Sequence, residues 1–484
     1  MISKNFFKSS FIYTVIGALP LGSSIILLPF YTNFLSTSDF GLLAIYIGFT
    51  FLIQIAVNFG MDTYIGIHYI HTSNDQKKLK ESLGTVIALL LISGLLFTLI
   101  FICIGDFSFK NIFTRGDINF YPFGFMSVLT AFFNSFFKTY SNLLINQQRP
   151  ERFLWINLFN FILTIIISII GIFLYPHTLI GPMWGRFLSG IGIFILALYF
   201  FLTEVGLHFK KDLLRDIFSF CMPITIYYLL GWVVSYIDRY IINNYMSSAD
   251  VGVFDFAVKC TLLIDFLQMG LANSITPKIF SIWKNKGASE SSVEVNKYYS
   301  GFTALSISAI LVTIILIPII VPLIVYKDQY YQAFIYVPVL AIGFGFKGLY
   351  NMFLNPIYFQ KKTKVLTKIF FISSVIQVIT SIFFIKAWGV WGIIWAGLFS
   401  KLIQVVLLYF ESRKIFSYKF NMTKLIMLPV FFSTIIIMTE IFFSKLMNIT
   451  ILHVSEFILI SIITLFVYKN EVALIRKMVF PPTV

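Results

Sequence analysis

The stretch NFLSTSDFG at residues 33–41 recurs 211 positions later as NYMSSADVG at residues 244–252. The same offset places Gly181 on Gly392, and the matches keep their order along the chain. Apolar periodicity alone would not produce such matches. The sequence therefore predicts an internal duplication.

The apolar composition sets the fold class. Of the 484 residues, 58% are hydrophobic and 12% are charged, and the mean hydropathy is +0.88. Soluble globular proteins carry about 25% charged residues, so this class is excluded. A bilayer core about 30 Å thick needs roughly 20 apolar residues per helix, and the chain offers fourteen such runs. These runs cover residues 11–35, 40–69, 82–104, 119–143, 153–175, 178–203, 216–243, 250–275, 300–326, 331–357, 367–386, 388–410, 424–446 and 451–469. The predicted fold class is all-α, a polytopic membrane protein with about 14 transmembrane helices.

The duplication groups these helices into two six-helix repeats and two C-terminal helices. An even number of helices returns the chain to its starting side, so both repeats insert in the same direction. Parallel repeats of this kind are typical of transporters, with the substrate site at the repeat interface. The predicted domains are an N-terminal six-helix lobe at 1–210, a C-terminal six-helix lobe at 211–415, and two additional helices with a cytoplasmic tail at 416–484.

The distribution of basic residues predicts the orientation. Of the 36 Lys and Arg residues, 25 fall in connections on one side, against 6 on the other. The side rich in Lys and Arg is normally cytoplasmic, so both termini are predicted in the cytoplasm. This topology signal accounts for the net charge of +15. No basic patch with interleaved aromatics stands outside the spans, so nucleic acid is not an expected partner.

Sequence features of enzymes and metal sites are missing. Cys103, Cys221 and Cys260 lie in apolar runs without a CxxC pair, which argues against a disulfide framework or a zinc site. The five His are scattered, and the outward loops are short. Residues 343–348 match GxGxxG, but they lie inside an apolar run, where close helix packing is the better interpretation. The protein is therefore not expected to be an enzyme.

Ionisable residues inside the spans are the candidate functional groups, because each costs about 2.5–3.5 kcal/mol to insert. Asp255 and Lys259 are predicted to pair within one helix, and Asp238 and Arg239 are placed at an outer helix end, where Arg can reach the interface. The candidate substrate-binding residues are Lys138, Arg186, Lys347, Lys401, Arg239, Lys259, Asn134 and Asn351. The candidate ion-coupling residues are Asp62, Asp265 and Glu440.

Lys138 and Lys347 connect these candidates to the duplication, since they are near-mates 209 positions apart. Each lies on a polar helix face, with Asn134 and Asn351 one turn away. A basic residue from each lobe would then face a shared cationic cavity suited to an anionic head group, because Arg grips phosphate bidentately and Lys acts as a point charge. The alternative is that the lysines form structural ion pairs with the three acids. Asp62 is expected either to carry a coupling H⁺ or Na⁺ or to pair with a lysine.

The chain also resembles a known family. The sequence IDRYII at 237–242, the sequence SADVG at 248–252, the two six-helix lobes and the two trailing helices are similar to the polysaccharide transporters of the MATE-like flippase superfamily, especially Wzx-type O-antigen and capsule-repeat flippases. The resemblance covers nearly the whole chain. It implies a bacterial inner-membrane flippase that moves a polyprenyl-pyrophosphate-linked oligosaccharide from the cytoplasmic to the outer leaflet by alternating access. The implied partners are this substrate, membrane lipid and other polysaccharide-assembly membrane proteins, and no cofactor is implied apart from H⁺ or Na⁺ coupling.

Three other interpretations remain. A MATE-like, ion-coupled exporter of cationic drugs would use acidic groups such as Asp62, Asp265 and Glu440. A membrane glycosyltransferase or polymerase of the same pathway would need a catalytic carboxylate cluster or a sizeable loop domain, and the sequence shows neither. Lipid scrambling without ion coupling is also open. The surplus of basic residues favours an anionic substrate.

Overall fold

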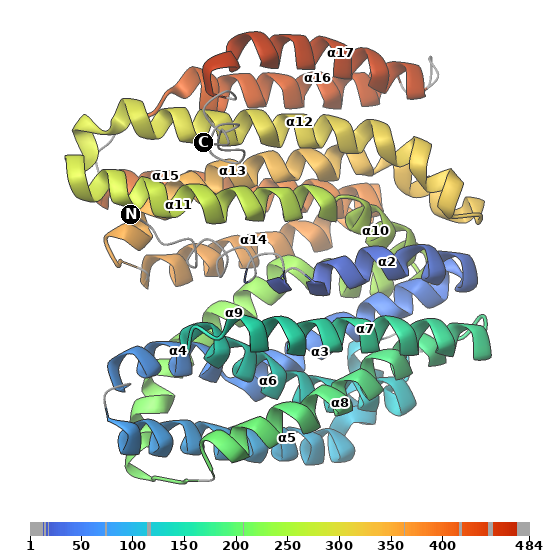
Figure 1. Cartoon of the computed structure of the whole chain (residues 1–484). Coiled ribbons are helices and arrows are strands. Elements are labelled where there is room, and N and C mark those ends of the chain that lie inside the picture. Colours follow the sequence, from blue (N-terminus) through green and yellow to red (C-terminus); the bar gives the residue numbers. More distant parts are fainter. Residues whose placement is uncertain are drawn as a thin grey trace. The chain divides into compact units, whose positions relative to one another are not determined.

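The structure is a computed structural model of the chain, shown in Figure 1. It describes Tyr13, Ile16, Gly17 and residues 19–72, 75–113, 118–206, 208–362, 364–415, 419–443 and 449–471. Helices and the short turns between them make up this described part, and it contains no strand. The predicted all-α class is confirmed.

The chain forms two compact units, Met1–Gly252 and Val253–Val484. The first unit contains α2 (Leu19–Phe34), α3 (Thr37–Asn58), α4 (Met61–Thr72), α5 (Gln76–Ile112), the π-helical turn η1 (Phe120–Gly124), α6 (Phe125–Asn146), α7 (Pro150–Leu174), α8 (Ile180–Glu204) and α9 (Asp212–Tyr245). Helix α10 (Ser248–Cys260) crosses the boundary. The predicted lobes at 1–210, 211–415 and 416–484 follow the repeat rather than these contacts, and they stay predictions.

The second unit continues the chain after α10. It contains α11 (Leu262–Glu290), α12 (Ser292–Ile324), the 3₁₀ turn η2 (Asp328–Ile335), α13 (Val337–Phe359), α14 (Lys364–Trp388), α15 (Val390–Ile415), the π-helical turn η3 (Thr423–Met427), α16 (Leu428–Phe443) and α17 (Ile449–Val467). A buried aliphatic core joins the last two helices to the rest of the unit, with Ile310 and Leu311 of α12 packed near Phe432 of α16 and Ile460 of α17.

Eleven helices in the described part of the chain are long and apolar enough to cross a membrane. They match eleven of the predicted runs, and the shorter apolar segment Leu452–Val467 matches the last one. The protein is thus a multi-pass membrane protein, as predicted.

Two of the predicted helices are broken rather than continuous. The run at 40–69 is interrupted because Phe59 and Gly60 have φ angles of 48° and 69°, a left-handed conformation that ends α3. The run at 250–275 is interrupted at Thr261, between α10 and α11. The apolar pattern continues across both positions and therefore concealed the breaks.

The duplicated stretch folds in the same way twice. At the start of α3, the Ser36 hydroxyl donates to Asp39 Oδ2 (2.6 Å) and accepts from the Asp39 amide (3.0 Å). At the start of α10, the Ser247 hydroxyl donates to Asp250 Oδ2 (2.5 Å) and accepts from the Asp250 amide (3.1 Å). Both serines lie 211 positions apart and satisfy a free helix N–H.

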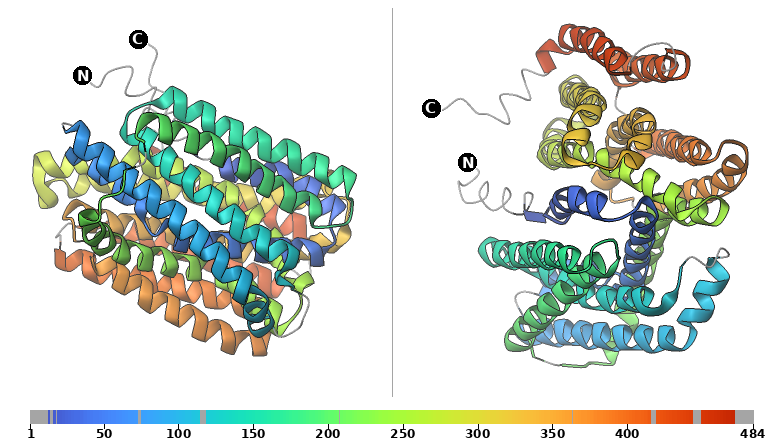
Figure 2. Two further views of the ribbon diagram at one scale, coloured as in Figure 1. Left: turned by 90° about the horizontal axis from the view of Figure 1, so that it is seen from below. Right: turned by 90° about the vertical axis from the view of Figure 1, so that its right-hand side faces the viewer.

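The last helix pair of each repeat is also built alike. Helices α7 and α8 run side by side, as do α14 and α15 (Figure 2). Thr164 donates to the Ser189 hydroxyl across the first pair (3.0 Å), and Ser400 donates to the Ser373 carbonyl across the second (2.9 Å). Ser189 and Ser400 are mates at the same offset. The predicted internal repeat is therefore present in the fold.

Candidate functional site

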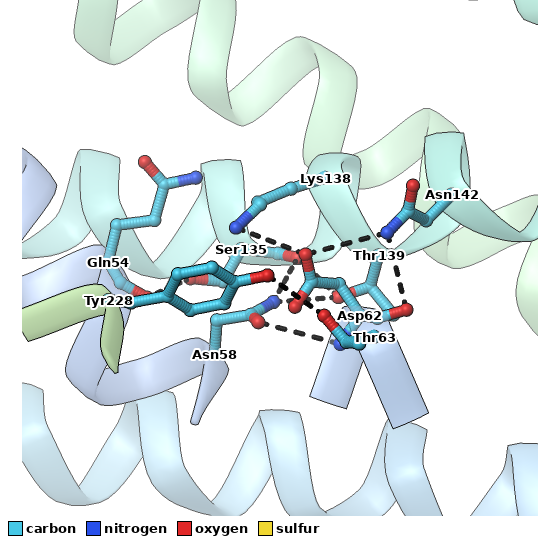
Figure 3. Close-up of polar contacts among 9 residues, drawn as sticks. All are labelled: Gln54, Asn58, Asp62, Thr63, Ser135, Lys138, Thr139, Asn142 and Tyr228. Carbon is cyan, nitrogen blue, oxygen red and sulfur yellow. Dashed lines mark hydrogen bonds and ion pairs between the residues drawn. The ribbon is translucent and has the colours of Figure 1, made fainter. Parts of the chain in front are cut away.

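A buried carboxylate and a half-exposed lysine pair inside the first unit. Lys138 of α6 places Nζ 3.1 Å from Oδ2 of Asp62 in α4, as Figure 3 shows. The Lys138 side chain is 42% exposed, whereas that of Asp62 is 3% exposed. Asp62 lies in the first turn of α4, directly after the break at Gly60, where the helix dipole favours a negative charge. The lysine is therefore held from one side and open on another.

Amide side chains surround the carboxylate. Asn142 of α6 donates to the Asp62 carbonyl (3.3 Å) and to Oδ2 (3.5 Å), and Asn58 donates to the Thr139 hydroxyl (2.9 Å) (Figure 3). Oδ1 of Asp62 is buried and has no hydrogen-bond partner within the described residues. A buried carboxylate oxygen left without a donor is costly. This atom can therefore accept a hydrogen bond from a further donor.

An aromatic ring borders the lysine. Nζ of Lys138 lies 4.9 Å from the centre of the Tyr228 ring of α9, within cation–π range. The Tyr228 hydroxyl is hydrogen-bonded to that of Thr63 (2.9 Å). The ammonium group thus has a carboxylate and a ring as neighbours, and its third side is available to a ligand or to water.

The second unit contains a corresponding pair. Lys347 of α13 forms an ion pair with Asp265 of α11, and their side chains are 35% and 27% exposed. Asp265 also lies in the first turn of its helix, after the break at Thr261. Lys401 of α15 is close by, since its Nζ lies 5.6 Å from the centre of the Phe344 ring.

In both units, a backbone carbonyl near the lysine accepts a hydrogen bond from a side-chain amide. In the first unit, the Asn58 amide donates to the carbonyl of Ser135, three residues before Lys138 (3.5 Å). In the second unit, the Gln268 amide donates to the carbonyl of Phe344, three residues before Lys347 (2.9 Å). In each unit, a lysine from the repeat's fourth predicted helix thus meets an aspartate from its second, next to an amide-to-carbonyl bridge.

The sequence of these helices contains the same signature twice. Lys138 is followed by Asn142 and Asn146 at steps of four, and Lys347 is followed by Asn351 and Asn355 at the same steps. Four-residue steps keep all three polar side chains on one helix face. This shared spacing identifies Asn142, which the sequence analysis missed.

Comparison with known proteins places the chain in a family. A family profile described as "Polysaccharide biosynthesis protein" matches residues 6–283, more than half of the chain. The chain belongs to this polysaccharide biosynthesis protein family. No curated protein matches the sequence.

Two solved structures with a similar fold are described as a flippase and a transporter. One described as "Lipid II flippase MurJ, inward closed conformation" is 16% identical with a TM-score of 0.70, and the match covers 98% of this chain and 99% of that one. A "multidrug resistance MATE family transporter of the MOP superfamily" in an inward-facing conformation is 14% identical with a TM-score of 0.67, covering 82% and 94%. This member of the polysaccharide biosynthesis family therefore has the fold of MOP-superfamily transporters. The resemblance to polysaccharide transporters of the MATE-like flippase superfamily is confirmed.

The remaining candidate cations of this family member have other surroundings. Lys259 pairs with Asp255 one turn away (2.9 Å), as predicted. Arg239 is buried, donates to the Ser235 carbonyl (2.7 Å) and lies 5.2 Å from the Tyr236 ring centre. Helix α9 continues to Tyr245, six residues beyond Arg239, and the expectation that Arg239 reaches the membrane interface stays a prediction.

The other candidates are not members of the two lysine–aspartate pairs. Arg186 of α8 and Asn134 of α6 are half-buried, and Asn351 of α13 is half-buried one turn beyond Lys347. Glu440 of α16 is buried beside His453 of α17. Roles for all of these residues in binding or coupling stay predictions.

Proposed function

We propose that this protein is a flippase that moves a polyprenyl-pyrophosphate-linked oligosaccharide from the cytoplasmic leaflet to the outer leaflet. Membership of a polysaccharide biosynthesis family and a fold shared with a lipid II flippase support a lipid-linked substrate. The proposal includes alternating access by rocking of the two repeats, a location in the bacterial inner membrane, and cytoplasmic termini. It also includes transport without catalysis and cooperation with other polysaccharide-assembly membrane proteins.

The observation that carries this proposal is the half-exposed lysine anchored to an aspartate, Lys138 with Asp62 in the first unit and Lys347 with Asp265 in the second. Lys138 is already desolvated on one side and placed by Asp62, so little side-chain freedom remains to be lost when a ligand binds. A pyrophosphate oxygen approaching its open side would form a charge-assisted hydrogen bond. A cationic drug would instead be repelled by the same ammonium group.

Substrate binding is proposed to alter the ion pairs. If Lys138 turns toward the pyrophosphate, Asp62 is left as a buried carboxylate without its cation, and Oδ1 already lacks a donor. Neutralising such a carboxylate then becomes more favourable. We therefore propose Asp62, with Asp265 and Glu440 as further candidates, for H⁺ or Na⁺ coupling. Lys347, Lys401, Arg186, Arg239, Lys259, Asn134 and Asn351 complete the proposed substrate-binding set.

The test is the sidedness of lipid-linked oligosaccharide in cells that lack the gene, measured with a membrane-impermeant probe. We expect intact units to accumulate on the cytoplasmic face and the wild-type gene to reverse this. Lys138→Gln and Lys347→Gln should each reduce rescue at least about tenfold, which is the rate equivalent of losing 1.4 kcal/mol of binding in the transition state. Lys110→Gln, at an exposed lysine of α5, is the matched control and should rescue fully.

Two outcomes would contradict the proposal. If the lipid-linked oligosaccharide on the cytoplasmic face is unchanged and resistance to cationic compounds is lost, the protein is a drug exporter. The carboxylates would then be the candidate binding groups. Full rescue by both lysine variants at wild-type protein levels would show that the lysine–aspartate pairs do not take part in substrate binding.

A further inference from the structure

The last two helices enclose a cluster of titratable side chains that lies apart from the lysine–aspartate pairs. Glu440 comes from the end of α16, and His453 and Glu456 come from the first two turns of α17. The exposed fractions of Glu440, His453 and Glu456 are 8%, 3% and 4%. Ionisable groups buried between membrane helices are rare and often functional.

The imidazole ring lies between the two carboxylates. His453 Nε2 is 3.3 Å from Glu440 Oε1, and His453 Nδ1 is 3.3 Å from Glu456 Oε2. The Thr439 hydroxyl donates to the other oxygen of Glu456. Both ring nitrogens therefore face carboxylate oxygens, one from each helix.

A neutral imidazole can donate to only one of the two carboxylate oxygens that its nitrogens face. A neutral ring has one N–H donor and one lone-pair nitrogen, whichever tautomer it adopts. With both glutamates ionised, the lone-pair nitrogen would face a second acceptor. An imidazolium ring, or a carboxylic acid in place of one carboxylate, would supply a donor to each of the two contacts.

A second proton would remove the remaining charge. With one added proton, two carboxylates and one imidazolium leave a net charge of −1. A buried net charge is costly in an apolar environment, and this cluster adjoins the aliphatic core through Ile436 and Ile460, each one turn from a glutamate. Binding of a second proton would make the cluster neutral and remove this cost.

Several charged groups of the packed helices have partners outside the cluster. Glu440 interacts electrostatically with His453 and Glu456. Helix α12 has no ionisable side chain from Ser300 to Ile324. Lys347 of α13 pairs with Asp265 of α11, and Lys424 of η3 pairs with Glu471. The other ionisable residues of these elements are Glu294, Lys297, Tyr298 and Tyr299 at the start of α12, Tyr326, Lys327 and Asp328 after it, Tyr350 and Tyr358 in α13, and Lys445, which lies outside the described residues.

We infer that Glu440, His453 and Glu456 form a proton-binding site in the α16–α17 pair, which holds one proton and exchanges a second. His453 and Glu456 thereby join Glu440 as residues of this proton-binding site. A role of this site in coupling flipping to a proton gradient rests on the proposed function, whereas proton binding itself does not. The ligand we infer is H⁺, and the described residues contain no group of His, Cys, Asp and Glu side chains arranged to hold a metal ion.

The direct test is an infrared titration of the full-length protein in detergent. Difference spectra between about pH 5 and pH 8, where histidine clusters titrate, should show a protonated-carboxyl band in the wild type. Glu440→Gln or Glu456→Gln should remove it, and His453→Gln should shift its midpoint. Glu290→Gln, at an exposed carboxylate of α11, is the control and should leave the band unchanged. A wild-type spectrum without a pH-dependent carboxyl band would overturn the inference even if a variant fails to fold.

Flipping assays then separate the two parts of the inference. Glu440→Gln and His453→Gln, complementing the deletion strain, should leave lipid-linked units on the cytoplasmic face, while Glu290→Gln should clear them. Normal flipping by both variants, with the infrared band lost, would overturn the coupling role and keep proton binding. Absence of flipping in the wild type would instead reject the proposed function, and the infrared titration would still decide the site.

Discussion

Gly41 and Gly252 pack against each other where the two copies of the repeated stretch meet. A Cβ atom on Gly41 would lie 2.8 Å from the Gly252 nitrogen, and one on Gly252 would lie 3.2 Å from the Gly41 nitrogen. The hydroxyls of Ser38 and Ser248 are 2.6 Å apart beside them. Because Gly41 and Gly252 are repeat mates, each presents the same face to the other, as at a two-fold axis. The absence of side chains here lets α3 and α10 touch backbone to backbone.

Adding one methyl group at this contact should destabilise the protein. Gly41→Ala and Gly252→Ala each force Cβ into backbone atoms that cannot move like a flexible side chain, and we expect a loss of about 1–3 kcal/mol. Gly231→Ala is the matched control, because a Cβ there meets no atom within 4 Å and alanine favours the α9 helix. Thermal unfolding in detergent, monitored by size-exclusion chromatography, should rank both variants below Gly231→Ala. Equal melting temperatures for all three would show that the contact is not tight.

The Lys138–Asp62 pair should show strong energetic coupling. Lys138→Met leaves a buried carboxylate unpaired, and Asp62→Asn leaves the lysine without its anchor. The two single changes should therefore together cost more stability than the double change. We expect a coupling energy of about 1–3 kcal/mol from a double-mutant cycle. The exposed Lys110–Asp106 pair, with Nζ and Oδ2 2.6 Å apart and side chains 74% and 51% exposed, should give less than about 1 kcal/mol. Similar values for the two cycles would mean that burial does not strengthen the inner pair.

Sequence alone predicted the all-helical fold and the repeat, because apolar runs and the 33–41 and 244–252 stretches are local features. It did not predict the breaks at Phe59–Gly60 and Thr261. The apolar pattern runs through both, and the backbone angles that end α3 depend on packing. Since Asp62 and Asp265 take their positions from these breaks, their partners were left open between a coupling ion and a lysine.

The buried histidine cluster was missed for a related reason. His453 is far from the other histidines in the sequence, and Glu440 lies thirteen residues earlier on a different helix. A local signal existed, since Glu456 follows His453 by three residues and therefore shares its helix face. Only the packing of α16 on α17 brings Glu440 to the opposite side of the ring.

The two serine caps should contribute equally, because their geometry is duplicated. Ser36→Ala and Ser247→Ala each remove the acceptor for a helix N–H, and we expect each to cost about 1 kcal/mol of stability. Thr at either position keeps the hydroxyl and should restore most of this loss. The control is Ser274→Ala on an exposed face of α11, where the hydroxyl only donates to the Gly270 carbonyl in its own helix. Thermal unfolding of the five variants would contradict the duplicated cap if only one alanine substitution lowers the melting temperature.

The two ends of α5 offer a test of the predicted orientation. Lys78 and Lys110 lie near opposite ends of this helix, and their side chains are 73% and 74% exposed. With Cys103→Ser as background and Cys221 and Cys260 buried, Lys78→Cys and Lys110→Cys each provide one reactive thiol. A membrane-impermeant maleimide should label Lys110→Cys in intact cells and Lys78→Cys only after permeabilisation, because the side rich in Lys and Arg faces the cytoplasm. The reverse labelling would place the termini outside.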